Sequence, residues 1–149
     1  MPDKATIERA RRDKQEGKSA STQAGEFVHK EIDNIRAGKH GARNTKQAIA
    51  IGLSEARRAG VNVKQPKKGT VSEKTRENAK RDTAKGKRHT PVNKSRSKAR
   101  TKALKKESTE AASPAALSQH ARAAAGKRSA ADRSRSARKA SETRGRSKG

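Results

Sequence analysis

The sequence contains no cysteine, no tryptophan and no tyrosine, and it has a single phenylalanine among 149 residues. Without cysteine there can be no disulfide bonds, thiolate metal ligands or thiol nucleophiles, and a reducing cytoplasm is compatible with the composition. Without aromatic platforms, recognition of single strands by base stacking is disfavoured.

Long apolar runs are also missing. No stretch of 18 apolar residues occurs, and the start MPDKATIERARR lacks the apolar centre of a signal peptide. We therefore expect a protein that neither spans a membrane nor carries a secretion signal. A cytoplasmic location, at the nucleoid if the partner is DNA, is the corresponding prediction.

Large apolar residues are scarce and unevenly placed. Fifteen Val, Ile, Leu, Met and Phe residues occur, of which nine lie in residues 27–63 and only three after Ser72. Ordering a residue costs about 1 to 2 kcal/mol, and buried apolar surface returns about 25 cal/mol per Å². We expect a short folded head and a remainder that cannot fold alone.

Positive charge is present in large excess, with 40 Lys and Arg against 15 Asp and Glu and a pI near 11.4. Residues 1–60 carry 13 basic against 8 acidic residues (net +5), whereas residues 61–149 carry 27 against 7 (net +20). Basic side chains laid along a phosphate backbone release condensed counterions. Nucleic acid is the expected partner, with DNA favoured and RNA possible. A merely solubilising tail is the alternative, although acidic residues serve solubility equally well.

The N-terminal part predicts two helices. Residues 3–16 suit a short polar helix with Asp3 as N-cap and Gly17 beyond its end. A second helix, capped by Ser21 or Thr22, ends at Gly38. Its apolar face recurs at helical spacing and comprises Ala24, Phe27, Val28, Ile32 and Ile35.

A third helix is predicted between Asn44 and Gly60, with Asn44 and Gln47 forming a capping box. Its central stripe is Ile49, Leu53 and Ala56, and small residues beside the stripe, Gly52 among them, allow a partner helix to approach closely. The fold class that follows is mostly α, with a helical hairpin over about residues 22–60 and flanking polar helices. The predicted head core is Phe27, Val28, Ile32, Ile35, Ile49, Leu53 and Ala56.

After a breaker at residues 65–69, Thr70 and Glu73 suggest a capping box for a charged helix ending near Lys85. Residues 77–87 repeat residues 8–18 with six identities in eleven, which fits either duplication or chance in so biased a composition.

Low-complexity Lys, Arg, Ser and Ala dominate the C-terminal part and predict an intrinsically disordered basic tail. The expected domains are a helical head (1–63), a linker with a charged helix (64–86) and the tail (87–149). One island, residues 113–126, has Ser113 as N-cap and Pro114 at the first helical position. We expect it to become helical on a polyanion.

Catalytic and metal motifs are weak. Gly17-Lys18-Ser19 resembles the end of a phosphate-binding P-loop, but the first glycine of that motif would fall at Arg12 and no strand precedes it. The histidine spacings suit no metal site, and so small a hairpin offers little room for a water-excluding pocket. The four histidines in question are His29, His40, His89 and His120. We expect no enzyme activity, no cofactor and no metal.

A helix-turn-helix over residues 47–54 is the alternative to one continuous core helix. A recognition helix starting at Ser54 would meet Gly60 within two turns, and Arg58 would occupy a position that needs an apolar residue. The continuous helix is favoured.

The remaining mode of recognition is contact with backbone phosphates, which positions a protein without reading sequence. The predicted function is non-enzymatic, largely sequence-independent DNA binding of a nucleoid-associated or histone-like kind. The alternatives are an RNA-binding or ribosome-associated protein and a protein-interaction module tethered by a basic tail. The candidate contacts are Arg43, Lys46, Arg57, Arg58, Lys67, Lys68, Lys87, Arg88, Lys94, Arg96, Lys98, Arg100, Lys102, Lys105, Lys106, Lys127, Arg128, Arg133, Arg135, Arg138 and Lys139.

Two residues do not fit a monomeric hairpin. Ile51 projects away from the central stripe, and Glu31 lies within the stripe of the preceding helix, where an unpaired carboxylate would be costly to bury. One interpretation is that Ile51 packs under the first helix or under the returning segment Val61–Val63. The other is that Ile51 forms an interface for self-association or for a protein partner, with Glu31 meeting a basic residue such as Arg43.

Three stretches carry a family resemblance: STQAGEF (21–27), GKHGAR (38–43) and KQAIAIGLSEARRAG (46–60). Over about residues 5–85 the chain resembles a family of small basic bacterial proteins of unknown function. The resemblance implies a bacterial source and no particular activity. The tail is also similar in composition to bacterial tails of the linker-histone type, which implies DNA compaction.

Overall fold

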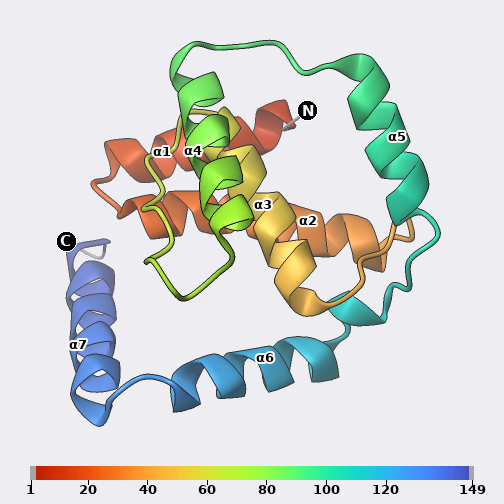
Figure 1. Ribbon diagram of the computed structural model, residues 1–149. Coiled ribbons are helices and arrows are strands. Elements are labelled where there is room, and N and C mark those ends of the chain that lie inside the picture. The colour runs from red at the N-terminus through yellow and green to blue at the C-terminus, as the bar shows by residue number, and fades with distance from the viewer. Residues whose placement is uncertain (1–2, 148–149) are drawn as a thin grey trace. The chain divides into compact units, whose positions relative to one another are not determined.

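The computed structural model describes residues 3–147, and the regular elements among them are all helices (Figure 1). By their internal contacts they fall into two compact units, Met1–Ser113 and Pro114–Gly149. The elements in chain order are α1 (Lys4–Gln15), α2 (Ala20–Arg36), α3 (Thr45–Arg58), α4 (Glu73–Lys87), α5 (Lys94–Leu104), the 3₁₀ turn η1 (Glu110–Ala112), α6 (Pro114–Gly126) and α7 (Ala130–Ser147).

The first three helices begin and end close to their predicted bounds. The N-cap of α2 is Ser19, two residues before the expected cap, and its hydroxyl accepts from the Thr22 amide. The Asn44 side chain accepts from the Gln47 amide at 2.9 Å, as predicted for α3. The Gln47 side chain accepts from the Arg43 amide at 2.6 Å, so the predicted capping box is not closed on Asn44. Gly17, Gly38 and Gly60 all adopt positive φ, where glycine follows a helix at no steric cost.

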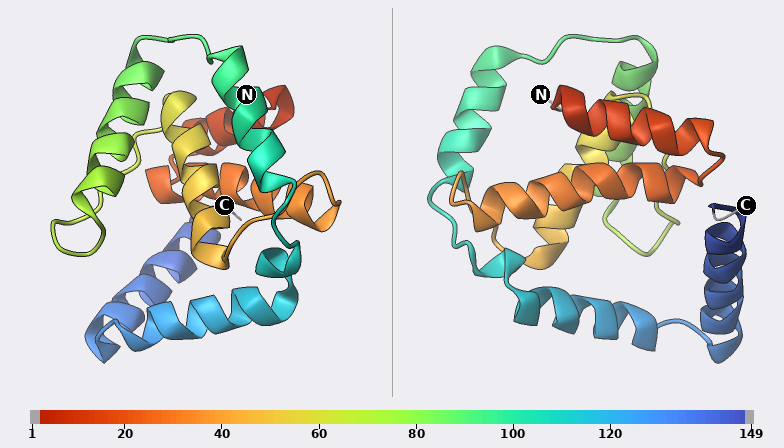
Figure 2. Two further views of the ribbon diagram at one scale, coloured as in Figure 1. Left: turned by 45° about the vertical axis from the view of Figure 1, so that its right-hand side comes forward. Right: turned by 180° about the vertical axis from the view of Figure 1, so that it is seen from behind.

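The centre of the first unit is the contact between α2 and α3. A Cβ placed on Gly52 of α3 would lie 2.6 Å from the Cα of Val28, so the two helix backbones touch at this point. Around them, α1 runs along α2 and α4 runs along α3 (Figures 1 and 2). Of the predicted core residues, Phe27, Ile32, Ile35 and Ala56 are buried, and Val28, Ile49 and Leu53 are partly buried.

The buried surface of α3 is wider than the predicted stripe. Ile51 is only 6% exposed, so its predicted exposure as an interface residue is wrong. The reason is that α3 is covered on several sides, by α2, α4 and η1, whereas the predicted hairpin provided a single partner helix. Ile51 is buried within the chain, as the other interpretation requires. It is not part of the core cluster that contains Ile7 of the first helix together with Val61 and Val63, the segments under which it was expected to pack.

The predicted disordered tail is also wrong, because residues 87–147 contain α5, η1, α6 and α7. Leu104, Ala111 and Ala112 are buried although the segment has almost no large apolar side chains. We expected disorder because this segment has few large apolar side chains to bury. In the structure, buried alanines and backbone hydrogen bonds attach the segment to the head.

Four hydrogen bonds attach residues 104–112 to the head. The amides of Gly41 and Ala42 donate to the carbonyl oxygens of Leu104 (2.9 Å) and Ser108 (3.0 Å). The remaining two are donated by side chains at the end of α2 and the start of α3: Arg36 Nε to Ala112 O (2.8 Å) and Thr45 Oγ1 to Ala111 O (2.7 Å). These hydrogen bonds satisfy backbone groups and hold residues 104–112 against the head. A prediction based on the number of large apolar side chains does not include this contribution.

The second unit is built from α6 and α7. The bounds of α6 agree with the predicted Pro114 start and Gly126 end, but the helix forms without a polyanion. Between the helices, Arg133 donates to the Ala125 carbonyl oxygen and Arg128 to the Asp132 carbonyl oxygen, each at 3.0 Å. The high helix propensity of Ala and Arg favours helices here although nearly all side chains are exposed.

The N-cap of α4 is Ser72, not Thr70, whose hydroxyl instead donates to the Lys67 carbonyl oxygen. The sequence echo between residues 8–18 and 77–87 has a structural counterpart, because its matched residues Ala10 and Ala79 are both buried. The matched aspartates Asp13 and Asp82 are buried as well. Each aspartate pairs with a base, Lys18 Nζ at 2.7 Å and Arg58 Nε at 2.8 Å respectively.

The contact at Gly52 yields a stability prediction with an internal control. We expect Gly52→Ala to lower the free energy of unfolding by about 1 to 3 kcal/mol, because the new methyl group collides with the Val28 backbone. Gly25 lies inside α2, and nothing lies within 4 Å of the position that a methyl group would take there. Gly25→Ala should therefore raise the free energy of unfolding by about 0.5 to 1 kcal/mol. Urea denaturation measures both, and equal shifts in the same direction would contradict the close approach of α2 and α3.

Candidate nucleic-acid interface and adjoining cavity

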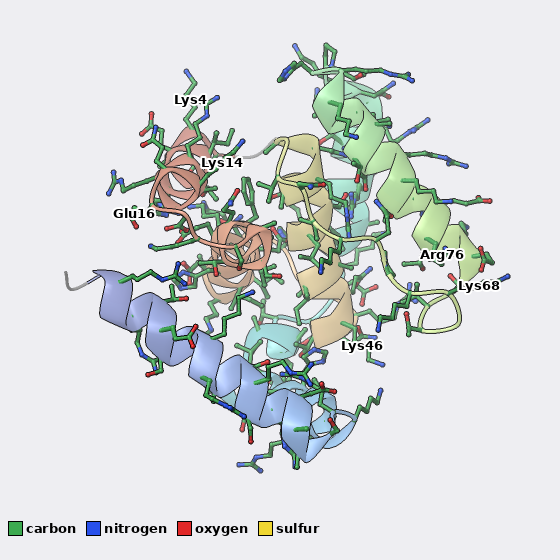
Figure 3. The ribbon with its side chains drawn as sticks, turned by 90° about the vertical axis from the view of Figure 1, so that its left-hand side faces the viewer. Lys4, Lys14, Glu16, Lys46, Lys68 and Arg76 are labelled. Carbon is green, nitrogen blue, oxygen red and sulfur yellow. The ribbon has the colours of Figure 1, made fainter. Side chains whose placement is uncertain are left out.

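The predicted phosphate contacts of the head fall into two groups. Arg43, Lys46, Lys67 and Lys68 are exposed, and Figure 3 shows Lys46 and Lys68 at the surface. Lys87 and Arg88, where α4 ends, are exposed as well. The other group consists of Arg57 and Arg58, whose side chains form hydrogen bonds within the protein.

Arg57 is only 7% exposed, so the expectation that it faces water or phosphate is wrong. Its Nη2 donates to the Lys64 carbonyl oxygen at 3.1 Å, and its Nε has no hydrogen-bond partner. Burial lowers the pKa of Arg57, whereas the charge of Asp82 acts in the opposite direction. A Cβ on Gly86 would collide with the Arg57 carbonyl oxygen, so the close contact of α4 with α3 covers this residue.

Arg58 is engaged in an ion pair across the same helix contact. Its Nε donates to Asp82 Oδ1 at 2.8 Å, while Ser54 donates to Asp82 Oδ2 at 2.6 Å. A phosphate would have to compete with this carboxylate for Arg58.

The densest cluster of free cations lies on α5 and the two residues after it. Residues 94–106 hold seven basic residues and no acidic one. At about 100° per residue, the lysines of this segment fall along one side of the helix and the arginines on another. We call Lys94, Lys98, Lys102 and Lys105 the outer lysine row; all four are exposed, and none has a side-chain hydrogen bond or ion pair within the described residues.

The second unit adds a further set of cations, with ten basic and two acidic residues over 114–149. Within it, Arg135 forms a long, exposed ion pair with Asp132 at 3.5 Å, and such pairs contribute little. The other predicted contacts here are all exposed: Lys127, Arg128, Arg133, Arg138 and Lys139.

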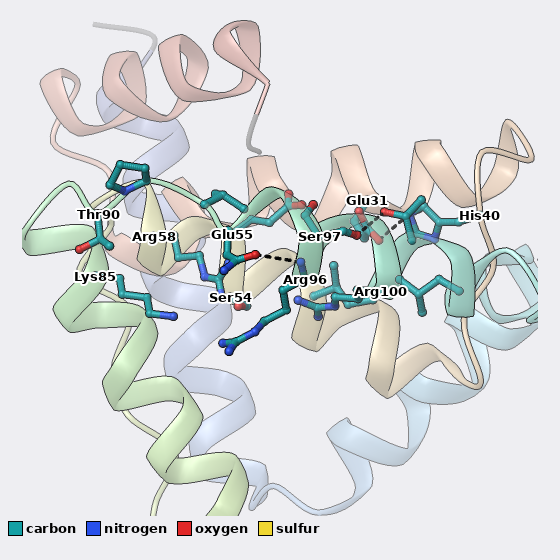
Figure 4. Close-up of a pocket in the computed structure, with 16 residues that line it drawn as sticks. Glu31, His40, Ser54, Glu55, Arg58, Lys85, Thr90, Arg96, Ser97 and Arg100 are labelled. Carbon is teal, nitrogen blue, oxygen red and sulfur yellow. Dashed lines mark hydrogen bonds and ion pairs between the residues drawn. The ribbon is translucent and has the colours of Figure 1, made fainter.

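The inner side of α5 borders a cavity of about 390 Å³ that reaches α2 and α3 (Figure 4). Two carboxylates line it, Glu31 from α2 and Glu55 from α3. Glu31 is only 2% exposed and pairs with His40 Nε2 at 2.9 Å, whereas the sequence suggested Arg43 as its partner. The other ring nitrogen of His40 lies 2.9 Å from the Gly41 carbonyl oxygen, which fixes the ring.

The two glutamates have perturbed acidities. Burial raises the pKa of Glu31, and the nearby His40 and Arg100 act in the opposite direction. Burial also raises the pKa of Glu55, and the charge of Glu31 raises it further. No group of three or more His, Asp or Glu side chains in residues 3–147 is placed to hold a metal ion.

Sequence reasoning found the cations of α5 but not their division between two sides of a helix. The signal was present as lysines four residues apart at positions 94, 98 and 102. In a disordered tail, which the composition predicts, this spacing would carry no meaning. The Glu31, His40 and Glu55 group needed the fold, since its members come from separate segments.

Residues 4–69 match a family model described as a Family of unknown function (DUF6496). The matched residues include α1, α2 and α3, and with them Glu31, His40 and Glu55, but not α5. No curated protein and no solved structure matches the chain. In the part of the chain that the structure describes, no helix is both long and apolar enough to cross a bilayer.

The raised pKa of Glu55 predicts a pH-dependent stability. The native state holds the Glu55 proton more tightly than the unfolded chain does. This contribution is therefore complete below the ordinary value of 4.5 and is lost as pH rises through the native pKa. We expect the Glu55→Gln variant to have a higher melting temperature than the unmodified protein at about pH 7.5, and the difference in melting temperature to be smaller at about pH 4. Differential scanning calorimetry at both pH values tests this, with the exposed Glu8→Gln as control. A loss of stability at neutral pH that Glu8→Gln does not share would contradict the prediction.

Proposed function

We propose that the protein binds nucleic acid without catalysis, by contacting the backbone phosphates of duplex DNA largely independently of sequence. The observation that supports this most directly is the outer lysine row on an ordered helix whose neighbourhood in sequence, residues 94–106, contains no acid.

The outer lysine row is electrostatically unfavourable unless an anion is present. Lysines four residues apart on a helix repel one another, and no carboxylate within the row offsets this repulsion. A row of phosphates removes the repulsion and releases condensed counterions, which supplies the driving force for binding. The same charges that oppose helix formation in the free chain thus favour the complex.

The attachment of α5 to the head also orders the row in advance. Leu104 is buried, and its carbonyl oxygen accepts from the Gly41 amide, so the C-terminal end of α5 is held by the folded core. An ordered row loses less conformational entropy on binding than a coil with the same charges.

The second unit supplies a further cationic segment on the same chain. Two binding segments joined covalently act at a high effective concentration, because the second contact becomes intramolecular once the first has formed. The total affinity then exceeds that of either segment and depends strongly on salt.

We expect no recognition of the base sequence, because the chain offers few side chains that could distinguish bases. Lysine ammonium groups that contact phosphates do not distinguish one base from another. The chain also lacks Trp and Tyr, and its one Phe, Phe27, is buried. The linker-histone-like composition of the C-terminal part favours DNA over RNA as the partner, whereas the family resemblance of the head implies no activity. Phosphates alone do not distinguish duplex DNA from RNA.

The outer lysine row predicts a change in salt dependence. For the triple variant Lys98→Gln, Lys102→Gln and Lys105→Gln, we expect the slope of log K against log salt to shrink by about 3, near 0.9 per phosphate contact. The matched control removes three exposed charges from α1, at Lys4, Arg11 and Lys14, and should change the slope by less than half as much. Fluorescence anisotropy on a labelled duplex measures both. Equal changes in the two triple variants would place the site elsewhere.

Sequence independence is tested separately. Duplexes of equal length and scrambled sequence should bind within about threefold of one another at fixed salt, because phosphate contacts do not discriminate bases. An RNA duplex is included in the same competition series. A preference above about tenfold for one DNA sequence would refute backbone-only recognition, and a comparable preference for the RNA duplex would favour the RNA alternative.

A further inference from the structure

The cavity behind α5 gathers cations from three different helices. Arg58 of α3, Lys85 of α4, and Arg96 and Arg100 of α5 all line it (Figure 4). These residues are distant in sequence, so their convergence is a product of the fold. They are also distinct from the outer lysine row, which occupies another side of α5.

Three of these four cations lack a neutralising partner. Arg58 is paired with Asp82. The side chains of Lys85, Arg96 and Arg100 form no hydrogen bond or ion pair within residues 3–147. The charge of Arg100 opposes the rise that burial causes in the pKa of both cavity glutamates, but the Arg100 side chain forms an ion pair with neither of them. The cavity is the open space between these cations and the carboxylates.

Neutral donors surround the same space. The hydroxyl-bearing Thr90 and Ser97 line it, and the N-terminus of α5 borders it through Asn93, whose side chain accepts from the Arg96 amide at 2.9 Å. Partial positive charge at a helix N-terminus favours an anion. A volume of about 390 Å³ admits a small charged group.

We propose that this cavity is a binding site for a phosphate group, held between Lys85 of α4 and the guanidinium groups of Arg96 and Arg100 of α5. Arginine presents paired donors that match two oxygens of a phosphate, and lysine supplies a point charge. The phosphate comes either from a free phosphate ester or from a nucleic-acid backbone. In both cases the site is additional to the outer lysine row.

The two glutamates couple this site to protons. A bound phosphate adds negative charge opposite Glu55, so a proton on Glu55 favours the complex. The charged groups that face Glu55 are Glu31 of α2, His40 of the α2–α3 loop, Arg58 of α3, Lys85 of α4, and Arg96 and Arg100 of α5. For an anion that keeps one charge state over this pH range, binding should therefore be tighter in mildly acidic than in mildly basic solution.

The test follows inorganic phosphate binding to the full chain at constant ionic strength, by NMR of the arginine Nε–Hε groups. We expect saturable shifts at Arg96 and Arg100. The double variant Lys85→Gln and Arg96→Gln should weaken binding by about tenfold or more, as loss of charge-assisted hydrogen bonds predicts. The matched control, Lys98→Gln with Lys102→Gln, removes equal charge from the outer row and should stay within about twofold. Equal weakening by both double variants, or shifts that never saturate, would overturn the proposal.

A second arm identifies the source of the phosphate. A short DNA duplex that displaces inorganic phosphate and shifts the same arginine signals indicates a backbone phosphate; a duplex that binds but leaves them unmoved indicates a free phosphate ester. Both results presuppose a saturable phosphate site. Duplex binding without any such site would refute this inference and leave the proposed function standing.

The role of Glu55 is tested with sulfate, a tetrahedral anion that keeps one charge state near neutral pH. We expect Glu55→Gln to bind sulfate more tightly than the unmodified protein at neutral pH, because a like charge beside the anion is gone. Glu8→Gln, which removes the same charge from the surface of α1, should bind sulfate as the unmodified protein does. Unchanged or weaker binding by Glu55→Gln would contradict the coupling.

Discussion

The close approach of α2 and α3 at Gly52 and Val28 is the contact on which the rest of the first unit depends. It brings the two most apolar helices together with few large side chains, and each then offers a second side for α1 or α4. The turn η1 contacts both helices, and the loop between them holds the end of α5. The α2–α3 contact therefore positions the loop to which the C-terminal end of α5 is attached.

The contacts of α1 and α4 with the central helices also contain little apolar surface. The outer helices α1 and α4 each bury one alanine and one paired aspartate at matched positions of the sequence echo, so ion pairs and small residues replace a larger apolar core. Breaking such a buried pair leaves an uncompensated charge. This explains why Arg58 serves the fold, while the cations left for a polyanion gather on α5 and in the second unit.

Local signals in the sequence were enough to place α1, α2 and α3, because caps such as Asn44 and stop signals such as Gly38 and Gly60 act within a few residues. The predictions that failed concerned contacts between residues distant in the sequence. The burial of Ile51 depends on several helices around α3, and the order of residues 104–112 depends on alanines and backbone hydrogen bonds to a distant loop. The unusual carboxylate of Glu31 was visible from its position in an apolar stripe, but its partner His40 was not.

The central claim is that α5 is already ordered, and attached to the head, before it meets a polyanion. Hydrogen–deuterium exchange of the free full-length protein, repeated with a duplex, tests it most directly. The account predicts that amides of α5, and the bonded amides of Gly41 and Ala42, are protected in the free protein and that the duplex adds little. Exchange of α5 at coil rates in the free protein, with protection only when the duplex is added, would contradict it.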